Sequence, residues 1–187
     1  MTPALTQEGI WTHARMRDEL PPESRVELID NELYELPMPT VSHQTTSANL
    51  QFAFHSFVRG QKLGYVFSAP LDVILDENEA VVLQPDLLVV LTANAAVLKK
   101  YVYGAPDLVV EIISPSSVVR DSVIKKDLYE AHGVREYWLL DPANRAIEVF
   151  ALENGRYRLD NYALEKGPVR SVVLPGFEVQ AETLFES

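Results

Sequence analysis

The chain of 187 residues contains no cysteine, which excludes disulfide bonds and thiolate metal ligands. This absence is compatible with the cytoplasm, which is the location we expect. No apolar run approaches the roughly 20 residues that a membrane-spanning helix needs. Residues 1–11 also lack the basic-then-apolar pattern of a signal peptide. Neither G-x-G-x-x-G nor a P-loop occurs, so the common glycine-rich phosphate-binding loops are excluded.

Basic residues are scarce relative to acidic ones. The chain has 16 lysines and arginines against 27 aspartates and glutamates, a formal net charge of −11. A protein that binds nucleic acid mainly through its phosphates usually carries the opposite sign. The composition therefore excludes a uniformly basic surface and leaves room only for a local basic patch.

The apolar content of 47% is enough for a substantial core. The length predicts one domain spanning residues 1–187. In order, the pattern predicts a helix ending near Leu20, a β-hairpin over 26–36 turning at Asp30-Asn31, and a helix over about 42–62. Strands over 65–76 and 81–91 follow, and their pattern predicts a second hairpin. With the elements after them, this order predicts an α+β fold with an α/β/α core, in which helices flank a mixed sheet.

The stretch over 106–142 is the most informative. It predicts a strand over 107–114, a helix over about 118–132 and a strand over 135–141. Glu111 lies in the middle of the first strand among apolar side chains. A carboxylate there is unfavourable unless it is paired or binds a metal. Glu111 therefore either forms a buried ion pair with Lys125 or Arg120, or helps to hold a cation.

Two Pro-Asp pairs, Pro85-Asp86 and Pro106-Asp107, precede apolar strands. Asp107 and Glu111 are four residues apart, so their side chains share one face of the strand. Asp86 joins them if its strand is a neighbour. Such a group of oxygens suits Mg²⁺, with Mn²⁺ as an alternative. The structural alternative for both aspartates is a strand-entry or turn residue, and for Asp107 we favour it.

Lys125 lies on the following helix, with Asp121 and Tyr129 each one turn away. Beside the carboxylates, its ammonium group would stabilise charge on a phosphoryl group or orient a water molecule. The alternative is an ordinary helical ion pair with Asp121, and Lys126 is the neighbour to distinguish from it. His43 lacks the i,i+4 partner of a helical zinc site, so it is predicted to be an ordinary polar position.

The run PDLVVEIISPSS, the spacing D-x-x-x-K-x-x-x-Y and the run HGVREYWLLDP resemble the Uma2-type endonucleases, a bacterial group with the restriction-endonuclease-like PD-(D/E)xK core. The runs VELIDNELYELPMPTVSHQ and QPDLLVV fit the same group, so the resemblance covers roughly residues 26–141. It implies a Mg²⁺-dependent endonuclease that hydrolyses phosphodiester bonds in DNA. The implied catalytic residues are Asp86, Glu111 and Lys125; Asp86 and Glu111 hold the metal, and Glu27 supports it.

The chain departs from the standard signature at one point. The lysine that normally lies two residues after the acid is replaced by Ile113, so the resemblance points to Lys125 on the next helix. Nucleases of this superfamily often pair subunits, which implies a homodimer. Two alternatives stay open: a catalytically silent nucleic-acid-binding or protein-interaction module of the same fold, which the net charge favours, and a metal-dependent hydrolase of small phosphodiesters.

Overall fold

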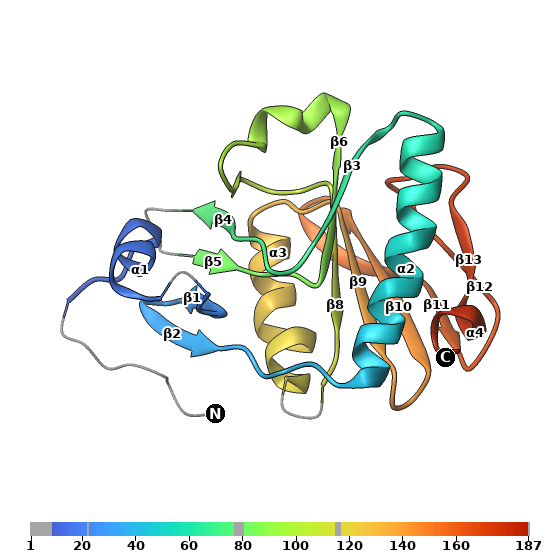
Figure 1. Cartoon of the computed structure of the whole chain (residues 1–187). Helices are drawn as coiled ribbons and strands as arrows, with labels where there is room; N and C mark the ends of the chain where they lie inside the picture. Colours follow the sequence, from blue (N-terminus) through green and yellow to red (C-terminus); the bar gives the residue numbers. More distant parts are fainter. Residues whose placement is uncertain (1–8, 22, 77–80, 115–116, 187) are drawn as a thin grey trace.

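Two β-sheets with helices between and beside them organise the computed structural model, which describes residues 9–21, 23–76, 81–114 and 117–186 (Figure 1). The smaller sheet has the order β2-β1-β5-β4-β7. Its strands are β1 (Val26–Ile29), β2 (Glu32–Glu35), β4 (Val73–Asp76), β5 (Val81–Leu83) and β7 (Val102–Tyr103). The larger sheet has the order β11-β10-β9-β8-β6-β3. Its strands are β3 (Gly64–Ser68), β6 (Leu87–Leu91), β8 (Leu108–Ile112), β9 (Glu136–Asp141), β10 (Ala146–Glu153) and β11 (Arg156–Leu164).

The helices form layers around these sheets. The long helix α2 covers one face of the larger sheet, and α3 lies between the two sheets (Figure 1). The helical segments are α1 (His13–Glu19), α2 (Val41–Gly60), the 3₁₀-helix η1 (Thr92–Val97), the π-helix η2 (Arg120–Lys125), α3 (Lys126–Ala131) and α4 (Ala181–Leu184). A two-stranded ribbon of β12 (Pro168–Arg170) and β13 (Glu178–Gln180) lies near the C-terminus. Within the described residues, no helix has both the length and the hydropathy needed to cross a bilayer.

The predicted α+β class with a mixed sheet is confirmed. In the larger sheet β8 and β9 run parallel, whereas the other neighbouring strands run antiparallel. The N-terminal hairpin is also confirmed: β1 and β2 pair antiparallel across Asp30 and Asn31, whose φ angles are 49° and 64°. Aspartate and asparagine tolerate these positive values better than most residues do, which explains the two-residue turn.

The predicted hairpin over 65–76 and 81–91 is confirmed in its antiparallel pairing, but it is divided between the two sheets: β3 pairs with β6 in the larger sheet and β4 with β5 in the smaller one. The chain leaves the larger sheet after β3, adds β4 and β5 to the smaller sheet, and returns to the larger sheet as β6. Pro70 and Pro85 lie at the two crossing points. Since proline has no N–H to donate to a ladder, it interrupts a strand where it occurs. The second crossing brings Asp86 to the space between the sheets.

Strand β8 shows how the core divides. Val110 and Ile112 pack against the α2 side of the larger sheet. Val109 packs on the other side, with Tyr129 and Tyr137. Because side chains alternate along a strand, Glu111 faces the same side as Val109. Its carboxylate therefore lies in the layer between the two sheets, where η2 and α3 are.

Two of the three phenylalanines of α2 give a direct test of this packing. Phe54 is fully buried, and its ring lies 5.6 Å from that of Trp138 and 4.8 Å from that of Phe177 between centroids. We expect Phe54→Ala to lower the free energy of unfolding by about 3–5 kcal/mol, measured by urea denaturation. Phe52 on the same helix is 75% exposed, so Phe52→Ala serves as the control and should change stability by about 0.5 kcal/mol or less. Equal losses in the two variants would contradict this account of the core.

Candidate active site

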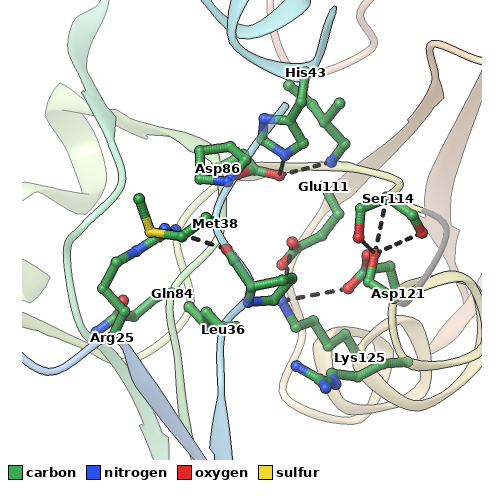
Figure 2. Close-up of a pocket in the computed structure, with 15 residues that line it drawn as sticks. Arg25, Leu36, Met38, His43, Gln84, Asp86, Glu111, Ser114, Asp121 and Lys125 are labelled. Atoms are coloured by element: carbon green, nitrogen blue, oxygen red, sulfur yellow. Dashed lines mark hydrogen bonds and ion pairs between the residues drawn. The ribbon is translucent and has the colours of Figure 1, made fainter. Parts of the chain in front are cut away.

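The pairing of β6 with β8 sets Asp86 and Glu111 side by side. Leu87 pairs with Val110 in an antiparallel register, so Asp86, one residue earlier, comes opposite Glu111. Asp86 Oδ2 accepts a hydrogen bond of 2.8 Å from the backbone N–H of Ile112, which fixes its carboxylate at the end of β8. Figure 2 shows the two acids lining the same hollow.

The same register separates the two Pro-Asp pairs. Since Val89 pairs with Leu108, Asp107 lies at the opposite end of β8 from Glu111. There it accepts hydrogen bonds from the backbone N–H of Leu91 at 2.8 Å and from Arg135 at 3.2 Å. Asp107 therefore has a structural position outside the site. The spacing of four residues puts Asp107 and Glu111 on the same face of the strand, but at opposite ends of it.

Lys125 occupies the centre of the site. Its Nζ lies 2.7 Å from Glu27 Oε1 and 3.0 Å from Glu111 Oε2, and its side chain is 3% exposed. Glu27 comes from the smaller sheet and Glu111 from the larger one, so a single ammonium group bridges both sheets. The expected helical partner Asp121 is more distant, at 3.5 Å. Lys126 points elsewhere, with its Nζ 3.8 Å from the centroid of the Phe150 ring.

A neutral donor also bonds one oxygen of each glutamate. The hydroxyl of Tyr129 donates to Glu111 Oε1 at 2.8 Å. The backbone N–H of Gln84, in the crossing segment between β5 and β6, donates to Glu27 Oε1 at 2.9 Å. Both glutamates are thus held in fixed orientations by groups that carry no charge, as expected of carboxylates that are fully buried.

The helical segment η2 turns its charged residues inward. Arg120, Asp121 and Lys125 are buried, whereas Val123 in η2 and Val119 just before it are 51% and 60% exposed. In an α-helix, Arg120 and Lys125 would lie about 140° apart around the axis. The wider π turn, with i→i+5 hydrogen bonds, brings residues five apart onto one face. The π-helix therefore allows both cations to face the site.

His43 is a site residue that its sequence spacing did not reveal. Its Nε2 lies 3.3 Å from Asp86 Oδ2, and its Nδ1 is buried without a hydrogen-bond partner in the described residues. Burial alone would lower the pKa of His43, but the hydrogen bond with Asp86 raises it overall. The prediction of an ordinary polar position rested only on the distance from His55. That criterion detects helical zinc sites, not a histidine that pairs with an acid on another element.

Burial dominates the protonation of the two glutamates. It raises the pKa of Glu27 and raises that of Glu111 further, although Lys125 opposes both shifts. Repulsion from Asp121 and Asp86 adds to the rise at Glu111. For Lys125, burial acts to lower the pKa, but the surrounding carboxylates outweigh it and raise the pKa well above its usual value. The ammonium group of Lys125 therefore stays charged, whereas burial and mutual repulsion make it unfavourable for all the surrounding acids to be ionised at once.

The donor set fits a hard cation. Four carboxylates surround two buried cations: Glu27, Asp86, Glu111 and Asp121 around Lys125 and Arg120. If all are ionised, four negative charges against two positive ones leave an excess of two, which a divalent ion would balance. In the described part of the chain, no three histidine or acidic side chains are arranged as a complete metal site. Mg²⁺ held by Asp86 and Glu111 would therefore keep several of its water ligands, as it commonly does.

The chain matches one family model and is similar to a solved structure over most of its length. A family model described as "Uma2: Putative restriction endonuclease" matches residues 13–182. A solved structure from Anabaena variabilis ATCC 29413, described as a "putative nuclease belonging to DUF820", superposes with a TM-score of 0.75 at 18% sequence identity. The match covers 94% of this chain and 97% of that one. Among curated proteins no significant match is found.

Replacing Lys125 tests whether the buried charges depend on it. Lys125→Met leaves Glu27 and Glu111 without their shared partner, so we expect it to cost about 3–5 kcal/mol at pH 7. Without the ammonium group the pKa of each buried glutamate rises further above 4.5, its ordinary value. The folded state then binds protons that the unfolded state does not, so stability increases as the pH falls toward 4.5. The loss measured by urea denaturation should therefore be smaller at pH 5 than at pH 7.

Lys126→Met is the matched control, because it removes one charge from the adjacent position together with a contact to the Phe150 ring. We expect it to cost about 1–2 kcal/mol or less, with no comparable change between pH 7 and pH 5. A loss at Lys125 that does not depend on pH would show that the glutamates are not uncompensated charges in the variant.

Proposed function

Because the chain belongs to the Uma2 family, we propose that it is a nuclease, and in particular a Mg²⁺-dependent endonuclease that hydrolyses phosphodiester bonds in DNA. The observation that supports this most directly is the convergence of Asp86, Glu111 and Lys125 on one cavity of about 50 Å³. Two acids from neighbouring strands and a lysine are the residue types that metal-assisted phosphodiester hydrolysis requires. Fold similarity alone would not distinguish this activity from others.

In this proposal Asp86 and Glu111 hold the metal, and Glu27 supports it through the lysine that it shares with Glu111. The chemistry that bound Mg²⁺ supplies is polarisation of a phosphoryl oxygen and access to hydroxide near neutral pH. Asp86 is prepared for such a role because its Oδ1 has no partner in the described residues, whereas Oδ2 is held by Ile112.

Lys125 supplies positive charge. Since its pKa is raised well above the usual value, it keeps its proton at neutral pH and acts as a fixed cation, not as a general base. A fixed cation beside a phosphate stabilises negative charge that develops on the non-bridging oxygens. Tyr129 keeps Glu111 oriented through its hydroxyl, whose own pKa is raised well above 10.0 by burial and by Glu111.

A catalytically silent nucleic-acid-binding or protein-interaction module of the same fold is the second candidate. The specific observation in its favour is that both oxygens of Glu111 already have partners, Tyr129 on Oε1 and Lys125 on Oε2. A purely structural ion pair would look the same. The net charge of −11 also favours this candidate.

Plasmid cleavage distinguishes the two candidates. We expect the purified protein to nick or linearise supercoiled plasmid in 5–10 mM Mg²⁺ or Mn²⁺ but not in EDTA, at concentrations chosen on the order of typical Mg²⁺ affinities. Glu111→Gln and Asp86→Asn should lower the rate by about 100-fold or more, because each removes a carboxylate charge that would hold the metal. Intact plasmid over a range of salts, with no divalent cation bound, would favour the silent module.

Asp107→Asn is the matched control, since it changes the aspartate of the other Pro-Asp pair at the far end of the same strand. We expect it to retain cleavage within about twofold, once its stability has been measured, because it lies outside the site. Cleavage that persists unchanged in Glu111→Gln would contradict the assignment of the catalytic residues.

Metal binding should also appear as a gain in stability. At a Mg²⁺ concentration tenfold above its Kd, linkage predicts about 1.4 kcal/mol, which raises the Tm of a chain of this size by roughly 3–5 °C. The shift should disappear in Glu111→Gln and persist in Asp107→Asn, as measured by differential scanning fluorimetry. An equal shift in both variants would place the cation elsewhere.

A further inference from the structure

Arg120 is a buried cation that the protein itself does not satisfy. Only 6% of its surface is exposed, yet its Nε and Nη1 are buried without a hydrogen-bond partner in the part of the chain that the structure describes. The nearest acidic oxygen is Glu27 Oε2, 3.9 Å from Nη1 and beyond hydrogen-bond reach. Glu27 Oε2 also lacks a partner. The proximity therefore lowers the electrostatic cost of burying Arg120 without providing its hydrogen bonds.

The position of Arg120 is nevertheless fixed. It lies on η2, where the π turn directs it to the same side as Lys125. Its guanidinium carbon lies 5.4 Å from the centroid of the Tyr34 ring, a cation–π contact that leaves the N–H groups unused. An oriented guanidinium with unused donors is the arrangement with which proteins bind carboxylate and phosphate groups.

Arg120 also lines the cavity that holds Asp86, Glu111 and Lys125. A second hollow, of about 360 Å³, adjoins it, and the two share Arg25, His43 and Asp86 as lining residues. The Nη1 group of Arg25 donates a hydrogen bond of 3.3 Å to the backbone carbonyl of Pro37. His43 adds its unpartnered Nδ1. Arginine and histidine nitrogens thus lie beside the carboxylates of this cavity, although the chain as a whole is strongly acidic.

We propose that Arg120, assisted by Arg25, forms a phosphate-binding subsite that receives one phosphate group of the substrate beside the carboxylates. This inference rests on the proposed function for the identity of the substrate, a nucleic acid. The subsite supplies the local positive charge that an acidic nuclease needs at its site. It makes Arg120 a substrate-binding residue, distinct from the cation-holding acids and from Lys125, whose ammonium group contacts Glu27 and Glu111.

The test measures binding without cleavage. Fluorescence anisotropy of a labelled DNA duplex is recorded in EDTA over a series of salt concentrations, for the wild type and for Arg120→Met. We expect the variant to bind about tenfold more weakly and its plot of log K against log[salt] to be less steep by about one unit, because one phosphate contact is lost. Arg120→Lys keeps the charge, so it should recover part of the affinity and most of the slope.

Arg158→Met is the matched control, because the side chain of Arg158 is 72% exposed and makes a surface ion pair with Glu153 at 3.6 Å. It removes the same charge from the surface and should leave the affinity and the slope unchanged. Circular dichroism and Tm confirm that each variant is folded. If Arg120→Met does not fold, Arg120→Lys and Arg25→Met carry the test, with losses of affinity in the same direction expected.

A second probe separates the subsite from the proposed function. Inorganic phosphate is titrated into the protein, and the Arg side-chain Nε–H signals are followed by NMR. If phosphate shifts an Arg signal that is absent in Arg120→Met, the subsite is supported even if DNA is neither bound nor cleaved, and only the substrate is wrong. If DNA is cleaved, but Arg120→Met keeps the wild-type affinity and salt slope, the proposed function holds and the subsite is overturned. If the wild type binds neither DNA nor phosphate, the subsite is overturned as well.

Discussion

The ammonium group of Lys125, held between Glu27 and Glu111, is the interaction on which the arrangement of the structure depends. Its contacts of 2.7 Å and 3.0 Å reach one acid in each sheet, so it connects the two sheets through the helical layer between them. The apolar cores on either side do not specify this alignment, because hydrophobic contacts are not directional. A buried ion pair contributes little net stability compared with an apolar alternative, but it penalises any arrangement that separates its partners.

The same interaction makes the site electrostatically unbalanced. Burial raises the pKa of both glutamates while Lys125 keeps its proton. An additional positive charge in the site would therefore be stabilised by the surrounding carboxylates. A divalent cation at Asp86 and Glu111 would relieve the repulsion among the acids, and a phosphate at Arg120 would use donors that the protein leaves without partners. Metal and substrate are thus expected to favour each other's binding.

Much of this could be predicted from local sequence. An acid in an apolar strand identified Glu111, whose partner the residues alone left open between Lys125 and Arg120; the family resemblance pointed to Lys125. The two-residue turn at Asp30-Asn31 identified the hairpin that carries Glu27. What could not be predicted depends on contacts between distant segments. The resemblance implied Asp86, but the physical reason that Asp86 and not Asp107 meets Glu111 is the crossing at Pro85 and the antiparallel register of β6 with β8. His43 was missed because its partner lies on another element. The π turn that directs Arg120 inward has no recognisable signal in the residues themselves.

The helix η2 has its charged residues inside, whereas its apolar residues Val123 and Ile124 are 51% and 37% exposed. Such a segment gains little from the hydrophobic effect, which would favour the opposite orientation by rotation about its own axis. Its orientation is instead maintained by charge, so its resting geometry follows the ionic state of the site beneath it. The exposed apolar side chains of this segment are thus the counterpart of its buried ion pairs, since one orientation of the helix cannot place both kinds of residue inside.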